Sequence, residues 1–140
     1  FLEEPVKLDI SHNVKEIEVK VHPEKAKTRK IEVNDLYISG KDFRNFKGKE
    51  VRLMHLFNVR LGKKQEITGT ENKEIPRINW ISDFVNARIM MPDGSWLGGI
   101  TEIAVKKLKP GTILQFERFG FVRFDNINGA GEYEFWFAHR

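Results

Sequence analysis

The chain has 140 residues, of which 40% are hydrophobic and 31% are charged, and it contains no cysteine. This composition predicts one compact domain with a sizeable core, and it excludes disulfide bonds and cysteine–metal sites. The net charge of +4 is a weak indication of a polyanionic partner.

No apolar run approaches the roughly 20 residues that span a membrane. The first residues also lack the features of a signal peptide, and the absence of an initiator methionine suggests a piece of a longer polypeptide. Because the chain has no cysteine as well, we expect a cytoplasmic protein with no membrane partner.

The first third of the sequence predicts three short strands. Apolar and polar residues alternate over 6–10 and again over 16–21, which is the pattern of half-buried strands. The pair His22-Pro23 ends the second of these, because proline cannot donate to a strand ladder. A basic loop over 24–30 then leads to a third strand over 31–38.

The middle of the chain predicts one short helix and one long strand. Ser39 can cap the N-terminus of a helix, and Asp42, three residues on, can make the reciprocal capping interaction. Gly48 ends that helix. A strong strand is expected over 50–61, with His55 on its apolar face. A shorter strand follows at 65–68.

The next segment predicts an edge strand and a hairpin. Residues 74–82 indicate an edge strand, since Pro76 would disrupt the centre of a sheet. The hairpin is expected around Pro92-Asp-Gly94, with strands over 88–91 and 95–100. Residues 101–109 are compatible with either a strand or a linker.

Residues 115–124 hold four aromatic rings, two arginines, one carboxylate and one amide. We interpret them as a long strand that bends at Gly120. Its phenylalanines are expected in the core, and Glu117 is expected to pair with a neighbouring arginine. A last strand ends at Trp136 and Phe137. About nine strands with one short helix predict an all-β barrel or sandwich.

The sequence has no constellation typical of an active site. Its four histidines are far apart and no cysteine accompanies them, which argues against a metal site. There is no glycine-rich phosphate loop and no serine in a nucleophile elbow. We therefore expect no catalytic residue, metal or cofactor within these 140 residues.

Basic residues gather in three clusters, over 20–30, 41–52 and 106–123. A solvated basic face explains any one of them. Three clusters around an aromatic-rich segment instead favour single-stranded RNA as the partner. Cations neutralise its phosphates, while aromatic rings and guanidinium planes stack on its unpaired bases.

An ordered series of motifs then carries a family resemblance. The motifs are His22-Pro23, Arg29, Tyr37-Ile-Ser with Asp42-Phe43, Gly48-Lys-Glu-Val-Arg-Leu53, Ile78-Asn-Trp-Ile81 and Gln115-Phe-Glu-Arg118. The series resembles the C-terminal anticodon-binding domain of the glutamyl- and glutaminyl-tRNA synthetases of the archaeal and eukaryotic type, a class I family. Pro92-Asp-Gly94 and residues 115–123 are more similar to the glutamyl branch in archaea. The resemblance covers nearly all of the chain.

The resemblance implies an all-β fold of two small β-barrels of the L25-like, glutaminyl-tRNA synthetase anticodon-binding type, with one short helix. The whole chain, 1–140, would then be one anticodon-binding domain. The barrel nearer the catalytic body would come from both ends of the chain, and the distal barrel from roughly residues 55–110.

The resemblance also implies which residues recognise the central uridine of the anticodon. In the glutaminyl relatives an arginine after the His-Pro motif and the glutamine of the Gln-Phe-Glu-Arg motif contact this base, and they align with Arg29 and Gln115. An amide can match the imide donor and carbonyl acceptors of uracil, and a guanidinium supplies further donors. Both tRNA families share this uridine, so the pair cannot separate glutamate from glutamine.

Other basic residues are nominated by charge and loop placement alone. Possible contacts to RNA backbone or bases are Lys25, Lys27, Arg60, Lys63, Lys64 and Arg77. Each of them is equally compatible with simple solvation.

The implied function is tRNA anticodon recognition as the C-terminal part of a glutamate–tRNA ligase, which attaches glutamate to tRNA. The partners would be the anticodon stem-loop and an N-terminal catalytic body of the same polypeptide, which uses ATP and Mg. Three alternatives stay open: the equivalent domain of glutaminyl-tRNA synthetase, a stand-alone RNA-binding barrel of L25-like fold, and a structural domain whose basic faces bind nothing.

Overall fold

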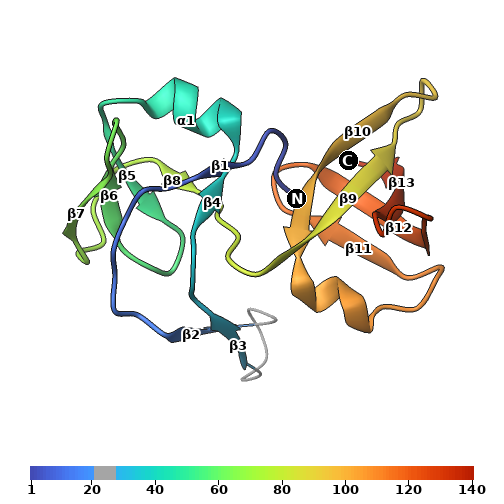
Figure 1. The fold of residues 1–140 in the computed structure, drawn as a ribbon, viewed down its shortest axis with the longest axis horizontal. Coiled ribbons are helices and arrows are strands. Elements are labelled where there is room, and N and C mark those ends of the chain that lie inside the picture. Colours follow the sequence, from blue (N-terminus) through green and yellow to red (C-terminus); the bar gives the residue numbers. More distant parts are fainter. Residues whose placement is uncertain (21–27) are drawn as a thin grey trace. The chain divides into compact units, whose positions relative to one another are not determined.

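The computed structural model describes residues 1–20 and 28–140. The described residues form thirteen strands, one short α-helix and one 3-10 segment (Figure 1). They divide into two compact units. Unit 1 comprises residues 1–5 and 84–140, and unit 2 comprises residues 6–83.

Unit 2 contains small sheets and the α-helix. Its elements are β1 (Val6–Lys7), β2 (Glu16–Lys20), β3 (Thr28–Glu32), β4 (Tyr37–Ile38), α1 (Gly40–Phe46), β5 (Glu50–Leu53), β6 (Asn58–Arg60), β7 (Glu66–Gly69) and β8 (Arg77–Ile78). Four strands form a sheet in the order β7-β6-β5-β8, while β1 pairs with β4 and β2 with β3. The buried core of this unit includes Leu36, Ile38, Leu53 and Ile78.

The α-helix begins as the sequence predicts. The Ser39 side chain accepts a hydrogen bond from the backbone N–H of Asp42 at 3.1 Å, which satisfies one of the free donors of the first turn. After the helix, Gly48 takes a φ of 81°, a left-handed conformation that glycine adopts at little cost. The predicted capped helix is therefore confirmed.

The single strand predicted over 50–61 is wrong, because the segment forms an antiparallel hairpin. β5 and β6 pair with each other, and the backbone N–H of Leu53 donates to Phe57 O at 2.9 Å across the turn. His55 lies in this turn with a φ of 65° and is exposed, so it is not on the buried face. The sequence concealed the turn, since no glycine, proline or asparagine marks it.

Unit 1 is built on one five-stranded sheet. Its elements are β9 (Phe84–Met90), β10 (Trp96–Glu102), the 3-10 segment η1 (Ile103–Lys107), β11 (Ile113–Phe116), β12 (Gly120–Ile127) and β13 (Tyr133–His139). The strand order is β10-β9-β13-β12-β11, in which β13 and β9 run parallel and the other pairs are antiparallel (Figure 1). A second core packs beneath this sheet, around Ile89, Val122 and Phe135.

The hairpin predicted around Pro92-Asp-Gly94 is confirmed. β9 and β10 pair over seven positions, and the backbone N–H of Met91 donates to Ser95 O at 2.8 Å. The Asp93 carboxylate also accepts from the backbone N–H of Ser95 at 2.9 Å. β10 then runs on to Glu102 before η1 begins, which divides the segment 101–109 between a strand and a 3-10 turn.

The long strand predicted over 115–124 is wrong, because this segment is also a hairpin. β11 ends at Phe116, and the backbone N–H of Phe119 donates to Phe116 O at 3.0 Å to close a tight turn. Arg118 takes the left-handed conformation in it, with a φ of 61°. Gly120 lies after the turn, where an added Cβ would sit 2.9 Å from the backbone oxygen of His139. This glycine therefore permits close packing at the start of β12.

The all-β class with one short α-helix is confirmed. Among the described residues the two larger sheets are open, with β10 and β11 at the edges of one and β7 and β8 at the edges of the other. The closed barrels of the expectation are therefore not established. The units also divide the chain at residues different from the expected distal segment of roughly 55–110. The expectation that the part made from both ends of the chain lies nearer a catalytic body stays a prediction.

Candidate RNA interface

Gln115 lies on β11 with its side chain exposed. The burial of β11 alternates, so Leu114 and Phe116 face the core while Ile113 and Gln115 face solvent. The Gln115 amide makes no hydrogen bond to any of the described residues. Its donors and its acceptor are therefore available to a ligand.

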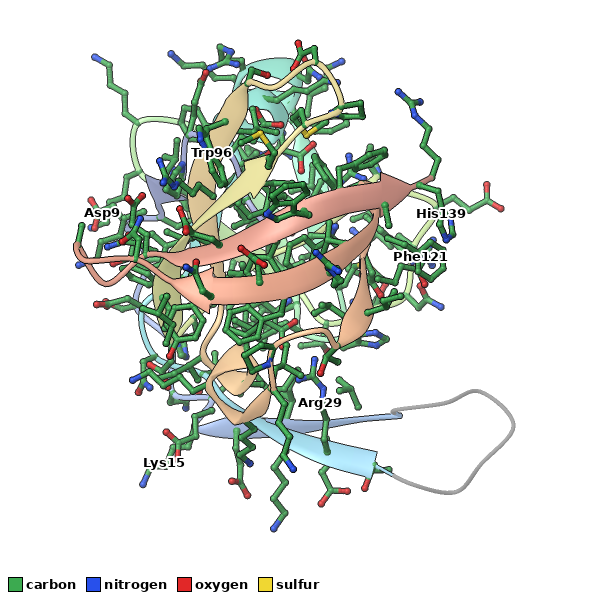
Figure 2. All side chains as sticks on the ribbon, turned by 90° about the vertical axis from the view of Figure 1, so that its right-hand side faces the viewer. Asp9, Lys15, Arg29, Trp96, Phe121 and His139 are labelled. Atoms are coloured by element: carbon green, nitrogen blue, oxygen red, sulfur yellow. The ribbon has the colours of Figure 1, made fainter. Side chains whose placement is uncertain are left out.

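The strand register places two rings beside Gln115. Phe121 on β12 is its direct cross-strand partner, and His139 on β13 is the partner of Phe121. The rings of Phe121 and His139 stack with centroids 4.6 Å apart and planes 30° apart. Figure 2 shows this pair side by side, with Trp96 lying away from it on β10. The amide thus stands next to an aromatic surface.

The expectation that all four phenylalanines of 115–124 are core residues is wrong for Phe121. Phe116 and Phe124 are buried and Phe119 packs against the core, but Phe121 lies on the opposite face of the sheet, in contact with His139. The hairpin is the cause. It restarts the alternation at Gly120, which turns Phe121 and Arg123 outward.

The ion pair expected for Glu117 is not formed with Arg123. Glu117 is exposed in the turn between β11 and β12, and no ion pair joins these two side chains in the described part of the chain. The Arg123 guanidinium instead lies over the ring of Trp136, 6.0 Å from its centroid.

Arg29 lies inside β3, where its cross-strand partner is Val19. It is half-buried, on the same side of the strand as Ile31, and it interacts with other groups of the protein. Arg29 is therefore part of a strand, and the expectation from the sequence that it belongs to the basic loop is wrong. Arg29 belongs to unit 2 and Gln115 to unit 1, so their contact with one base stays a prediction.

The other nominated residues lie in unit 2 or outside the described residues. Lys25 and Lys27 fall in the range 21–27, which is not described. Lys63 and Lys64 are exposed between β6 and β7. Arg60 and Arg77 are exposed but make internal contacts, since Arg60 Nη1 donates to Gly48 O at 3.2 Å and Arg77 Nη2 donates to Asn72 Oδ1 at 2.5 Å. Each guanidinium has further N–H donors, so these bonds leave both arginines able to contact RNA.

Comparison with protein families identifies the kind of domain to which Gln115 and its neighbours belong. Two models of the family described as tRNA synthetases class I (E and Q), anti-codon binding domain, match the chain, one over residues 1–80 and the other over residues 55–125. The chain belongs to this family. The second match includes Gln115, so the exposed amide lies within the part of the chain that this family model matches.

Similar curated proteins agree with this assignment. The chain is 31% identical over its whole length to the glutamate–tRNA ligase of Methanocaldococcus jannaschii, and 28% identical over 99% of its length to that of Methanosphaera stadtmanae. It is 30% identical over 89% of its length to the glutamate–tRNA ligase of Korarchaeum cryptofilum. This anticodon-binding domain spans only 28%, 28% and 25% of the lengths of these relatives.

The described residues hold no group of three or more His, Cys, Asp or Glu placed to bind a metal ion. None of the helices in that part of the chain has the length and apolar character needed to cross a bilayer.

The Glu50 carboxylate interacts with the cationic side chains of Lys73 and Arg60. The Thr68 hydroxyl donates to Glu50, and Lys73 Nζ lies 3.3 Å from the same carboxylate. The hydrogen bond from Thr68 holds the pKa of Glu50 below its usual range, and the charges of Lys73 and Arg60 add to the effect. Part of the positive potential of Arg60 is therefore offset inside the protein.

We expect Thr68→Val to raise the pKa of Glu50 toward its ordinary value, because the substitution removes the strongest hydrogen bond to the ionised form. A pH titration of the Glu50 carboxyl carbon by NMR measures this change. Since the folded-state pKa is lowered, this interaction stabilises the fold above the ordinary carboxylate pKa and is lost as the pH falls through the folded-state value. An unchanged titration curve would show that Thr68 does not set this pKa.

The sequence did not lead us to the partners of Gln115 on the sheet. Phe121, Arg123, Trp136 and His139 share its face because of the pairing of β11, β12 and β13. The available signal was the alternation of Phe121, Val122, Arg123 and Phe124, which puts the first and third residues on one face once Gly120 is taken as the start of a strand.

Proposed function

We propose that this domain binds the anticodon stem-loop of a tRNA, as the C-terminal part of a glutamate–tRNA ligase. The observation that carries the proposal is the exposed Gln115 amide, which has no hydrogen-bond partner among the described residues and lies beside the stacked rings of Phe121 and His139. Unpaired bases are recognised by stacking on such rings and by hydrogen bonds to their edges. The family match and the names of the similar ligases support tRNA as the RNA.

In this proposal Gln115 recognises the central uridine together with Arg29. Uracil presents one imide donor between two carbonyl acceptors, so an amide can accept from the imide while donating to a carbonyl. A guanidinium can only donate, and it therefore favours the carbonyls of uracil over the amino group of cytosine. Each of the two units carries one of these residues, and the exposed side chains of Lys63 and Lys64 supply charge for the RNA backbone.

The aminoacylation step lies outside these 140 residues in the proposal. The parent polypeptide would use ATP and magnesium in an N-terminal catalytic body and would act in the cytoplasm. The glutaminyl enzyme's equivalent domain is less favoured, because the similar proteins above are glutamate–tRNA ligases.

Replacement of the central uridine in the RNA tests the proposal. An anticodon stem-loop with cytidine at this position is expected to bind the chain about 5- to 150-fold more weakly than the uridine form, which corresponds to about 1–3 kcal/mol. Fluorescence anisotropy at fixed salt measures both affinities. A stem-loop with altered stem pairs and the same loop is the control, and it should bind as the parent does.

Two outcomes would contradict the proposal. Equal binding of the uridine and cytidine forms would indicate a generic RNA-binding domain, because affinity that comes only from phosphates does not depend on base identity. No binding of either form at low salt would indicate a structural domain.

A further inference from the structure

A single row of side chains crosses all five strands on the outer face of the sheet in unit 1. Direct cross-strand pairing joins its members in order. They are Ile113 on β11, Arg123 on β12, Trp136 on β13, Met90 on β9 and Trp96 on β10, and we call them the outer row. With strands about 4.8 Å apart, the outer row spans about 19 Å.

The outer row contains two indole rings and one guanidinium, and a second guanidinium lies beside it. Its rings stay accessible, with Trp136 46% and Trp96 39% exposed. Arg123 lies over Trp136. Arg88, two residues before Met90 on the same face of β9, lies 3.9 Å from the ring centroid of Trp96. Two exposed indoles, each under a guanidinium, thus occupy one face of the domain.

The two arginines differ in their partners. Arg88 Nε donates to Glu134 Oε2 at 2.6 Å, and Glu134 is 7% exposed, so this arginine is fixed and largely neutralised. Arg123 is exposed and forms no ion pair within the described residues. The net positive charge of the outer row therefore lies at Arg123, between Ile113 and Trp136.

The outer row continues directly from Gln115. Ile113 and Gln115 are neighbours on the exposed face of β11, and Arg123 and Phe121 are neighbours on that of β12. A nucleotide next to a base bound at Gln115 can therefore reach Ile113 and Arg123 in the outer row. Arginine and indole side chains suit that nucleotide, because a guanidinium can neutralise its phosphate and a ring can stack on its base.

We propose that the outer row is a stacking site for unpaired nucleotides of the anticodon loop that adjoin the base at Gln115. Trp136 takes the first of these bases and Arg123 contacts the phosphate. The inference rests on the proposed function, since the RNA must be placed by Gln115. RNA is the occupant because the outer row adjoins Gln115, and because Arg123, which forms no ion pair with any described residue, can offer its donors to a phosphate.

A double-mutant cycle between protein and RNA tests the inference. Trp136→Ala in the 140-residue chain is expected to bind the anticodon stem-loop about 5- to 100-fold more weakly. In a scan of abasic loop positions outside the central base, one abasic RNA should bind the unaltered chain equally weakly. Combining that RNA with Trp136→Ala should then give no further loss, because the two changes remove the same contact.

Three further variants sharpen the result. Trp136→Phe keeps a ring and should retain most of the affinity. Arg123→Gln should weaken binding and reduce the slope of log affinity against log salt by about 1. Ile127→Ala removes an exposed apolar side chain of β12 that lies outside the outer row, and it should bind as the unaltered chain does.

The outcomes separate the inference from the proposed function. The preference for central uridine over cytidine should persist in Trp136→Ala and Arg123→Gln. If the unaltered chain discriminates these bases but Trp136→Ala and Arg123→Gln bind normally, the outer row is not an RNA site, although the proposed function stands. If the unaltered chain does not bind the stem-loop, both fail. Additive losses at every loop position would also overturn the inference.

Discussion

Gln115→Ala is expected to lower the preference for uridine over cytidine at the central anticodon position by about 1–3 kcal/mol. The side chain amide is the group on β11 that can accept from the uracil imide and donate to a carbonyl at once. Its loss leaves the imide without an acceptor in the complex, and an unmet donor costs more than the average hydrogen bond gains. The variant should therefore bind the uridine form more weakly and the cytidine form about equally.

The measurement compares both RNAs with both proteins under one salt concentration. Ile113→Ala is a matched control, because Ile113 is the other exposed residue of β11 and lies two positions away on the same face. It should leave the base preference unchanged, whatever its effect on affinity. Stability should change by less than about 0.5 kcal/mol for Gln115→Ala, since the side chain is exposed and has no partner among the described residues.

The preference could instead survive in Gln115→Ala. That result would remove Gln115 from the base-recognition site and leave the selectivity to other residues. Arg29→Ala then becomes the decisive variant. A guanidinium faces an acceptor in uracil and an amino donor in cytosine at the same ring position, so it discriminates between the two bases without an amide.

The class of the fold could be predicted from the sequence because strand alternation and helix capping are local properties. The Ser39 cap and the hairpin around Pro92-Asp-Gly94 depend on residues close in sequence, and both are present. The two strands predicted over 50–61 and 115–124 failed for a common reason. Their turns place a histidine and an arginine in left-handed conformations, so the sequence carries none of the usual turn residues.

The candidate site was predicted only in part, because its members come together through strand order. Gln115 could be named from the motif that contains it, but its neighbours Phe121 and His139 meet through pairing between β12 and β13. The parallel pairing of β13 with β9 then adds Met90 and Trp96 to the same face. Non-local pairings of this kind are not encoded in the periodicity of any single segment.

Arg29 was assigned to a loop from its sequence neighbours, although it lies in a strand. Its position after a proline and several lysines indicated a loop, whereas it lies in β3 opposite Val19. The alternation of β3 puts Arg29 on the half-buried side, which reflects the amphipathic character of a long arginine stem.

Gly99→Ala is expected to destabilise unit 1 by about 2.5–6 kcal/mol, the sum of a buried leucine and two hydrogen bonds. A Cβ at Gly99 would lie 2.1 Å from the backbone oxygen of Leu2, a distance that no side-chain adjustment can relieve. Leu2 must therefore leave the edge of β10, where it is 4% exposed and exchanges hydrogen bonds of 2.8 and 3.0 Å with Ile100.

Gly98→Ala is the matched control for this substitution, because nothing lies within 4 Å of a Cβ at that position. Both variants place the same residue type in β10 one position apart, so intrinsic strand preference affects them equally. Urea unfolding should separate them, with Gly98→Ala within about 0.5 kcal/mol of the unaltered chain. The NMR signals of Leu2 and Ile100 should shift only in Gly99→Ala. Equal stability of the two variants would mean that residues 1–5 contribute little to unit 1, and that its sheet holds together without the chain segment that covers the β10 edge.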